Sequence, residues 1–234
     1  MVDRFKQHLN EMAMTMMKLY LSNKMNLLRI ILYGLGLFVT AFGIILIIRT
    51  NLGAGPWDTV NYNLHVLTGI TIGTASFLIN TSIVVFVVLY NKNPKFFISM
   101  IPVLSLSLFI DFWDILIFGT YYPTGLIWRL FLIVLGAFIL TFGLALVVMT
   151  RYPAMVFEEL TFVVMRMFKT KSFLIARIFI ETLAITIATI LGFTASIGFG
   201  AVGPASIIMA ALIGPMVSFH ARYMSHFTKQ TLSR

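Results

Sequence analysis

The sequence of 234 residues contains no cysteine. Disulfide bonds, thiol nucleophiles and thiolate metal sites are therefore excluded. Charged residues are also scarce, at 11%, whereas hydrophobic residues make up 59% and the mean hydropathy is +0.97. A chain of this composition has too little polar surface to cover a water-soluble globule. The sequence therefore predicts an integral membrane protein.

Motifs of common enzyme classes are missing as well. The sequence has no G-x-x-x-x-G-K-[ST], H-E-x-x-H or G-x-S-x-G pattern, and the four histidines, at positions 8, 65, 220 and 226, do not have metal-ligand spacing. We therefore expect no enzymatic activity and no cofactor or metal. An intramembrane enzyme that uses pairs of acids is the alternative.

Six apolar runs are long enough to cross a hydrocarbon core about 30 Å thick as helices. They lie near residues 27–49, 71–91, 96–118, 126–149, 172–194 and 201–222. None shows the alternation of a lipid-facing strand, and helices satisfy their own backbone hydrogen bonds in lipid. The predicted fold is an all-α membrane protein with six transmembrane helices.

Basic residues indicate the orientation in the membrane. Lys and Arg cluster before the first span, at Lys92 and Lys95, in residues 151–171 and after the sixth span, whereas the loops at 119–128 and 192–200 have none. By the positive-inside rule both termini are cytoplasmic, and Arg49 is the one exception. The net charge of +9 is thus explained by topology, and we expect no nucleic-acid partner.

Two terminal segments fall outside the spans. Residues 1–26 place Phe5, Leu9, Met12, Met16 and Tyr20 on one helical face, which predicts a cytoplasmic amphipathic helix on the membrane surface. Residues 223–234 are expected to form a cytoplasmic tail.

The chain resembles itself when it is shifted by one hundred residues. Nine residues in a gapless window from Arg29 meet identical residues in the window from Arg129: Arg29, Leu32, Leu35, Gly36, Phe38, Phe42, Gly43, Leu46 and Thr50. Since three spans separate the two windows, the halves 27–122 and 123–222 are predicted to be inverted repeats. A duplicated bundle with a purely structural role is the alternative.

The first repeat contains a break, RTNLGAGPWD, at residues 49–58. Gly53 and Gly55 allow unusual backbone angles, and Pro56 suits the first position of a new helix, with Trp57 next to it. We expect a short interfacial or re-entrant helix over residues 56–69, with Asp58 in its first turn, and Glu158 at the matching place in the second half.

This stretch, with Leu52-Gly53, Pro56, Trp57 and Asp58, resembles the signature of the YczE/YyaS/YitT group of bacterial membrane proteins. Phe109-Ile110-Asp111 and Gly214-Pro215 are similar to weaker motifs of that group, and the resemblance covers about residues 27–222. It implies a six-helix protein of the bacterial inner membrane, for which transport is the usual suggestion. The second half has Tyr152-Pro153 in place of the signature.

Six ionisable residues in or beside the spans are the candidate substrate-binding residues: Arg49, Asp58, Asp111, Glu158, Arg177 and Glu181. Ionisable groups in lipid are costly and usually contact a partner or a cavity. Structural alternatives exist for each of them. Asp58 is suited to capping its helix, Arg177 and Glu181 to a structural ion pair, and Asp111 and Asp114 to an interfacial cluster with Arg49 and Arg129.

These features together favour a secondary carrier of a small solute, an anion being the candidate suggested by Arg49 and the helix start. A non-transporting accessory or substrate-capture subunit, working with an enzyme or ATPase, is the alternative. The expected partners are the lipid bilayer, the solute, and a second copy or another membrane protein.

Overall fold

The computed structural model describes residues 25–152 and 156–232, and within these residues every regular element is helical. The elements are α2 (Met25–Arg49), α3 (Pro56–Thr68), α4 (Ile72–Asn91), η1 (Pro94–Ser99), α5 (Met100–Asp111), η2 (Phe112–Phe118), α6 (Leu126–Met149), α7 (Val156–Met167), α8 (Phe173–Thr194) and α9 (Pro204–Leu232). The amphipathic helix predicted for residues 1–26 lies outside the described part, apart from the two residues that begin α2.

Six helical segments are long and apolar enough to cross a membrane, as the sequence predicts. They are Leu27–Arg49, Ile72–Asn91, Pro94–Phe118, Leu126–Met149, Phe173–Thr194 and Pro204–Met224. The last helix, α9, continues to Leu232, so most of the predicted tail is helical. The third span is interrupted: it starts as the 3-10 helix η1 and ends as the π-helix η2, neither of which the apolar pattern indicates.

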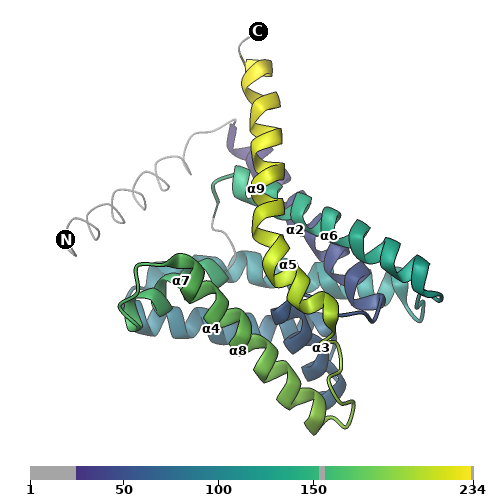
Figure 1. The fold of residues 1–234 in the computed structure, drawn as a ribbon. Coiled ribbons are helices and arrows are strands. Elements are labelled where there is room, and N and C mark those ends of the chain that lie inside the picture. Colours follow the sequence, from purple (N-terminus) through teal and green to yellow (C-terminus); the bar gives the residue numbers. More distant parts are fainter. Residues whose placement is uncertain (1–24, 153–155, 233–234) are drawn as a thin grey trace.

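Helices α2 and α6 pack closely along their length (Figure 1). Gly36 meets Gly143 and Val147, and Gly43 meets the backbone of Leu140, so the two helices run antiparallel. A Cβ atom at either glycine would collide with the other helix. Small residues at such contacts let two backbones approach, and dispersion contacts then hold the helices together in lipid.

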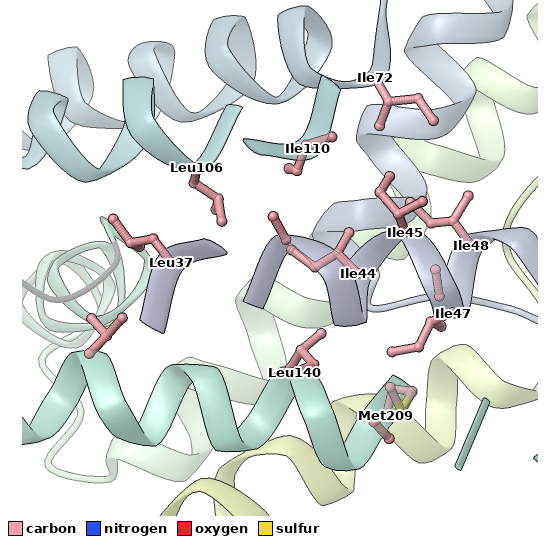
Figure 2. Packing of buried hydrophobic residues seen from close by; sticks show 14 of the residues in the cluster. Leu37, Ile44, Ile45, Ile47, Ile48, Ile72, Leu106, Ile110, Leu140 and Met209 are labelled. Carbon is pink, nitrogen blue, oxygen red and sulfur yellow. The ribbon is translucent and has the colours of Figure 1, made fainter. Parts of the chain in front are cut away.

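The main apolar cluster surrounds α2 (Figure 2). Leu37, Ile44 and Ile45 of α2 are buried with Leu106 and Ile110 of α5. On another side of α2, Ile47 packs with Leu140 of α6 and Met209 of α9. Helix α2 is therefore the element on which α5 and α6 converge.

The remaining helices pack in pairs. Helix α3 lies against α8 and α4, and α7 lies against α4 and α8. Helix α5 packs on α2 and α4, whereas α9 packs on α6. Within the described residues α9 makes few contacts with α8, and Figure 1 shows it rising away from α8 after their connecting loop. The short helices α3 and α7 are thus held between longer helices.

Candidate functional site

Helix α3 begins at Pro56, where Gly53, Gly55 and Pro56 predict the start of a new helix. Gly53 has φ +123°, and a Cβ atom there would collide with the backbone of Ser206 at the start of α9. The loop is fixed to α9 by two hydrogen bonds, from Ala54 N–H to Ser206 Oγ at 3.2 Å and from Ala205 N–H to Leu52 O at 3.3 Å. Pro56 then occupies the first turn. The loop and the helix start are therefore positioned by the opposite half of the chain.

The first turns of the two short helices touch. The rings of Trp57 on α3 and Phe157 on α7 stack with their centroids 5.0 Å apart and an interplanar angle of 26°. Asp58 follows Trp57 and Glu158 follows Phe157 in the sequence, so each short helix carries an acid in its first turn directly after its aromatic ring. All four side chains are partly buried. The contact brings together two segments that the sequence separates by a hundred positions.

Helix α8 brings two further ionisable groups to this place. Arg177 Nε lies 2.7 Å from Glu181 Oε1, so the predicted pairing of these residues is correct. Burial, and secondarily the negative charge of Glu181, raise the pKa of Asp58 to about 7. Burial also raises the pKa of Glu158, partly offset by the positive charge of Arg177. Asp58, Glu158, Arg177 and Glu181 therefore interact electrostatically across three helices.

Near the starts of α3 and α7 and in the middle of α8, several buried polar atoms have no hydrogen-bond partner. They are Trp57 Nε1, Asn61 Oδ1, Glu158 Oε2 and Glu181 Oε2. Three of the four are acceptors. A buried polar atom without a partner costs about 1–3 kcal/mol, so each needs an explanation such as a bound ligand or water. We define the central site as Trp57, Asp58, Asn61, Phe157, Glu158, Arg177 and Glu181.

A line of polar and aromatic side chains extends from the central site along α3. Asp58, Tyr62 and His65 have the spacing of one helix face, and the rings of Tyr62 and His65 are 5.8 Å apart. The pKa of Tyr62 is raised by burial first, and then by the charge of Tyr122 and a hydrogen bond to it. This face of α3 therefore connects the central site with the loop that contains Tyr122.

Arg49 is engaged at that loop rather than in the central site. Its Nη2 atom lies 2.6 Å from Asp114 Oδ1 and donates to Asp114 O at 3.0 Å, while its guanidinium stacks 4.6 Å from the centre of the Tyr122 ring. Both members of the pair are buried. The expected pairing of Arg49 with the acids of the third span holds for Asp114.

Asp111 and Arg129, the other two members of the expected cluster, bind elsewhere. Asp111 accepts hydrogen bonds from Thr71 Oγ1 and Gly73 N–H, both at 2.7 Å, and so holds the start of α4. Arg129 donates to the carbonyl oxygens of Thr50 and Asn51 at 2.5 and 2.6 Å. No sequence signal connects Asp111 with residues forty positions away.

Two buried residues escaped the sequence reasoning. Asn63 donates to the carbonyl oxygens of Ala188 and Phe199 and accepts from Ala201 N–H, which ties α3 to the end of α8 and its loop. His220 of α9 is 5% exposed, and its ring lies 4.6 Å from the Phe138 ring. A polar residue within an apolar helix was the only sequence signal for Asn63 and His220. The spacing of residues along the chain does not show which groups they contact.

The described residues hold no group of three or more histidine and acidic side chains arranged to bind a metal ion. The acids of the central site are therefore too dispersed to form a metal centre by themselves. The starts of α3 and α7 therefore form a site with acidic and aromatic side chains and with polar atoms that lack hydrogen-bond partners.

The chain is similar in sequence to a family of unknown function and to uncharacterized proteins of Bacillus subtilis. The family DUF6198, described as a family of unknown function, matches residues 27–222. The uncharacterized protein YyaS of Bacillus subtilis is 24% identical over 168 residues, covering 72% of this chain and 82% of YyaS. The uncharacterized membrane protein YczE of the same organism is 30% identical over 112 residues, covering 47% of this chain and 52% of YczE. No solved structure matches.

Proposed function

The chain belongs to the family of unknown function DUF6198, and from the contact between its two short helices we propose that it is a secondary carrier of a small solute. The substrate site of this carrier is the central site. We place this carrier in the bacterial inner membrane, which the family resemblance implies. Both termini are proposed to be cytoplasmic, because basic residues favour that side of the membrane.

Reciprocal glycine contacts support an inverted repeat. Two elements related by a twofold axis make each contact twice. If residue i of the first element contacts residue j of the second, then residue j of the first contacts residue i of the second. Gly36 contacts Gly143 and Val147. Shifting these three positions by one hundred residues gives Gly136, Gly43 and Ile47, and Gly136 contacts both Gly43 and Ile47. Because α2 and α6 are antiparallel, an axis relating them lies perpendicular to the helices and hence in the membrane plane.

The pairing of helices supports the same arrangement. Helix α3 packs on α8 as α7 packs on α4, and α5 packs on α2 as α9 packs on α6. Trp57 and Phe157, themselves one hundred positions apart, contact each other, as residues beside a twofold axis do. The two short helices then enter from opposite sides of the membrane.

The lengths of α3 and α7 fit re-entrant helices. With 13 and 12 residues, they extend about 20 and 18 Å, less than the roughly 30 Å of the hydrocarbon core. Asp58, in the first turn of α3, interacts with Glu181 near the middle of α8. Carriers with inverted repeats bind their substrates near the midplane, at the starts of such broken helices. The observation that carries the proposal is the Trp57–Phe157 contact.

Flux through reconstituted protein tests the proposal. Purified protein in liposomes is screened with small anions, amines and neutral metabolites on a solid-supported membrane, which records charge movement, and with labelled solutes. The double variant Asp58→Asn with Glu158→Gln is expected to lose transport, because it removes an acid from each half. Glu159→Gln is the matched control: Glu159 adjoins Glu158, and the cation that acts on it is Arg166.

Two outcomes would count against a carrier. Unchanged flux in the double amide variant would show that Asp58 and Glu158 have structural roles and take no part in transport. Absence of flux for the whole panel, together with stoichiometric copurification of an ATPase or synthase, would instead favour an accessory subunit.

A further inference from the structure

The ends of α4 and α7 carry a group of basic residues. Lys92 caps the end of α4, Lys95 lies in η1, Arg166 lies in the last turn of α7, and Lys169 and Lys171 follow it. All four lysines are exposed. The sequence has no aspartate or glutamate in residues 59–110 or 160–180, so neither segment supplies a counter-charge. We name these five residues the basic cluster.

The two basic segments lie at one place on the molecule. Helices α4 and α7 pack against each other and share a buried apolar cluster (Figure 1). At their ends, Arg166 Nη2 donates to Asn91 Oδ1 at 2.7 Å. Lys92 adjoins Asn91 in the chain, and Lys169 N–H donates to Arg166 O at 3.4 Å. The hydrogen bond between Arg166 and Asn91 therefore joins the segment that carries Lys92 to the segment that carries Lys169.

Arg166 is fixed in place but has no acidic partner. Its Nε atom is buried, its Nη2 atom is bonded to Asn91, and its guanidinium carbon lies 5.8 Å from the centre of the Tyr90 ring. Glu159 acts on it electrostatically, yet no carboxylate among the described residues forms an ion pair with it. Nη1 makes no hydrogen bond to the described residues. An arginine held in this way can donate from Nη1 to a phosphate oxygen.

The position of the basic cluster favours a lipid as the source of that phosphate. One span ends at Asn91, the next begins at Pro94, and the fifth begins at Phe173. Basic residues at the ends of spans lie at the level of the lipid headgroups. Beside them, Phe97 and Phe168 are 48% and 60% exposed. An anionic phospholipid brings a phosphate for the cations and acyl chains that cover these rings, whereas a soluble phosphate brings only the charge.

We propose that the basic cluster binds the headgroup of an anionic phospholipid, with a phosphate oxygen on Arg166 Nη1. The lysines attract the headgroup through their charge and need not touch the same phosphate. The bound lipid lies where α4 and α7 end and stabilises their contact. This proposal is independent of the carrier function, since no residue of the basic cluster belongs to the central site.

Native mass spectrometry of the full chain in a neutral detergent tests the proposal. The probes are phosphatidylglycerol, phosphatidylcholine with the same acyl chains, and glycerol 3-phosphate, which has a phosphate but no chain. Phosphatidylglycerol is expected to bind at least about tenfold more tightly than phosphatidylcholine, whose choline cancels the phosphate charge. Glycerol 3-phosphate is expected not to displace it.

Two outcomes with the unchanged protein would overturn the proposal. Equal affinity for phosphatidylglycerol and phosphatidylcholine would show that the headgroup charge is not recognised. Displacement of phosphatidylglycerol by an equal concentration of glycerol 3-phosphate would show that the site takes a free phosphate and not a lipid.

Variants locate the binding. Arg166→Gln is expected to weaken the binding of phosphatidylglycerol by about fivefold or more, because it removes one cation at the membrane surface. Since Arg166 also bonds to Asn91, its loss can lower stability, so the double variant Lys92→Gln with Lys169→Gln is measured as well. Both lysines are exposed. The double variant is expected to weaken binding by about 25-fold and to leave Tm in lipid-free detergent unchanged.

Arg151→Gln is the matched control, because Arg151 is an exposed arginine in the loop before α7, at the other end of that helix from Arg166. It is expected to leave the affinity for phosphatidylglycerol unchanged. Unchanged affinity in both Arg166→Gln and the double lysine variant would overturn the assignment to the basic cluster. A loss in Arg151→Gln as large as that in Arg166→Gln would also overturn it, since net charge alone would then explain the binding.

Discussion

Arg49 and Asp114 are joined twice at one carboxylate oxygen: Nε and Nη2 of Arg49 lie 3.1 and 2.6 Å from Asp114 Oδ1. The arginine ends α2, and the aspartate lies in the π-helix at the end of the third span. Because both side chains are buried, neither charge has water as an alternative partner. This pair connects α2 to the loop that carries Tyr121 and Tyr122.

Asp114→Asn is therefore expected to destabilise the protein by about 3–5 kcal/mol, because it leaves the buried guanidinium of Arg49 without its counter-charge. The double variant Arg49→Met with Asp114→Asn should recover part of this loss. Detergent melting curves measure both. Lys95→Met, which removes an exposed cation, is the control and should leave Tm unchanged. Additive losses in the double variant would show that the two residues do not interact.

Substitution of Gly36 tests the close packing of α2 on α6. Gly36→Val is expected to destabilise the protein by at least about 1–3 kcal/mol, because its Cβ would collide with Gly143 and Val147. Gly34→Val in the same helix is the matched control, since no atom outside the local backbone lies within 4 Å of a Cβ there. Tm and monodispersity in detergent report the difference. Equal effects of the two changes would contradict the α2–α6 contact.

The pKa of Asp58 predicts a pH dependence of stability. Burial raises this pKa from 3.8 to about 7, so the folded state holds the proton more tightly than the unfolded state. The resulting stabilisation is complete below pH 4 and is lost as the pH rises through about 7, by up to about 1.4 kcal/mol per pH unit. Tm should therefore fall between about pH 4 and pH 7.

Asp58→Asn should flatten this dependence, since an amide does not titrate. A residual slope of the same sign is expected from Glu158 and Glu159, whose pKa values burial also raises. The measurement is Tm against pH for the wild type and for Asp58→Asn. Identical slopes in the two proteins would show that Asp58 is not buried in this way.

Single cysteines test the orientation, because the natural chain contains none and gives no background labelling. A reporter or cysteine at Lys92 should be cytoplasmic, and one at Tyr122 should be external, since basic residues favour the cytoplasmic side. Both residues are at least partly exposed. Impermeant maleimide on intact cells should therefore label only the position at 122. A cytoplasmic position for Tyr122 would remove the inverted-repeat proposal.

Local chemistry predicted much of the fold. Runs of apolar residues located the six long helices, because lipid requires about 20 such residues per crossing. Gly55 and Pro56 located the start of α3, since a helix N-terminus favours proline in its first turn. The pairing of Arg177 with Glu181 followed from their spacing on one helix face.

Contacts between distant segments could not be derived in this way. The capping of α4 by Asp111 depends on how α5 packs against α4, which periodicity does not encode. The π-helix η2 has the same apolar composition as an α-helix, so its extra width is invisible in the sequence. The central site combines both situations: its acids were identified as candidates, whereas the Trp57–Phe157 contact and the unsatisfied acceptors appear only in three dimensions.

The unequal packing of the last two helices has a mechanical consequence. Helix α5 lies against α4, whereas α9 makes few contacts with its counterpart α8 within the described residues. In the proposed inverted-repeat carrier, exchanging the geometries of the two halves would produce a second conformer in which α9 folds onto α8 and α5 leaves α4. The bonds from Thr71 and Gly73 to Asp111 would break in that conformer. Asp111 would then hold the start of α4 in one conformer and not in the other.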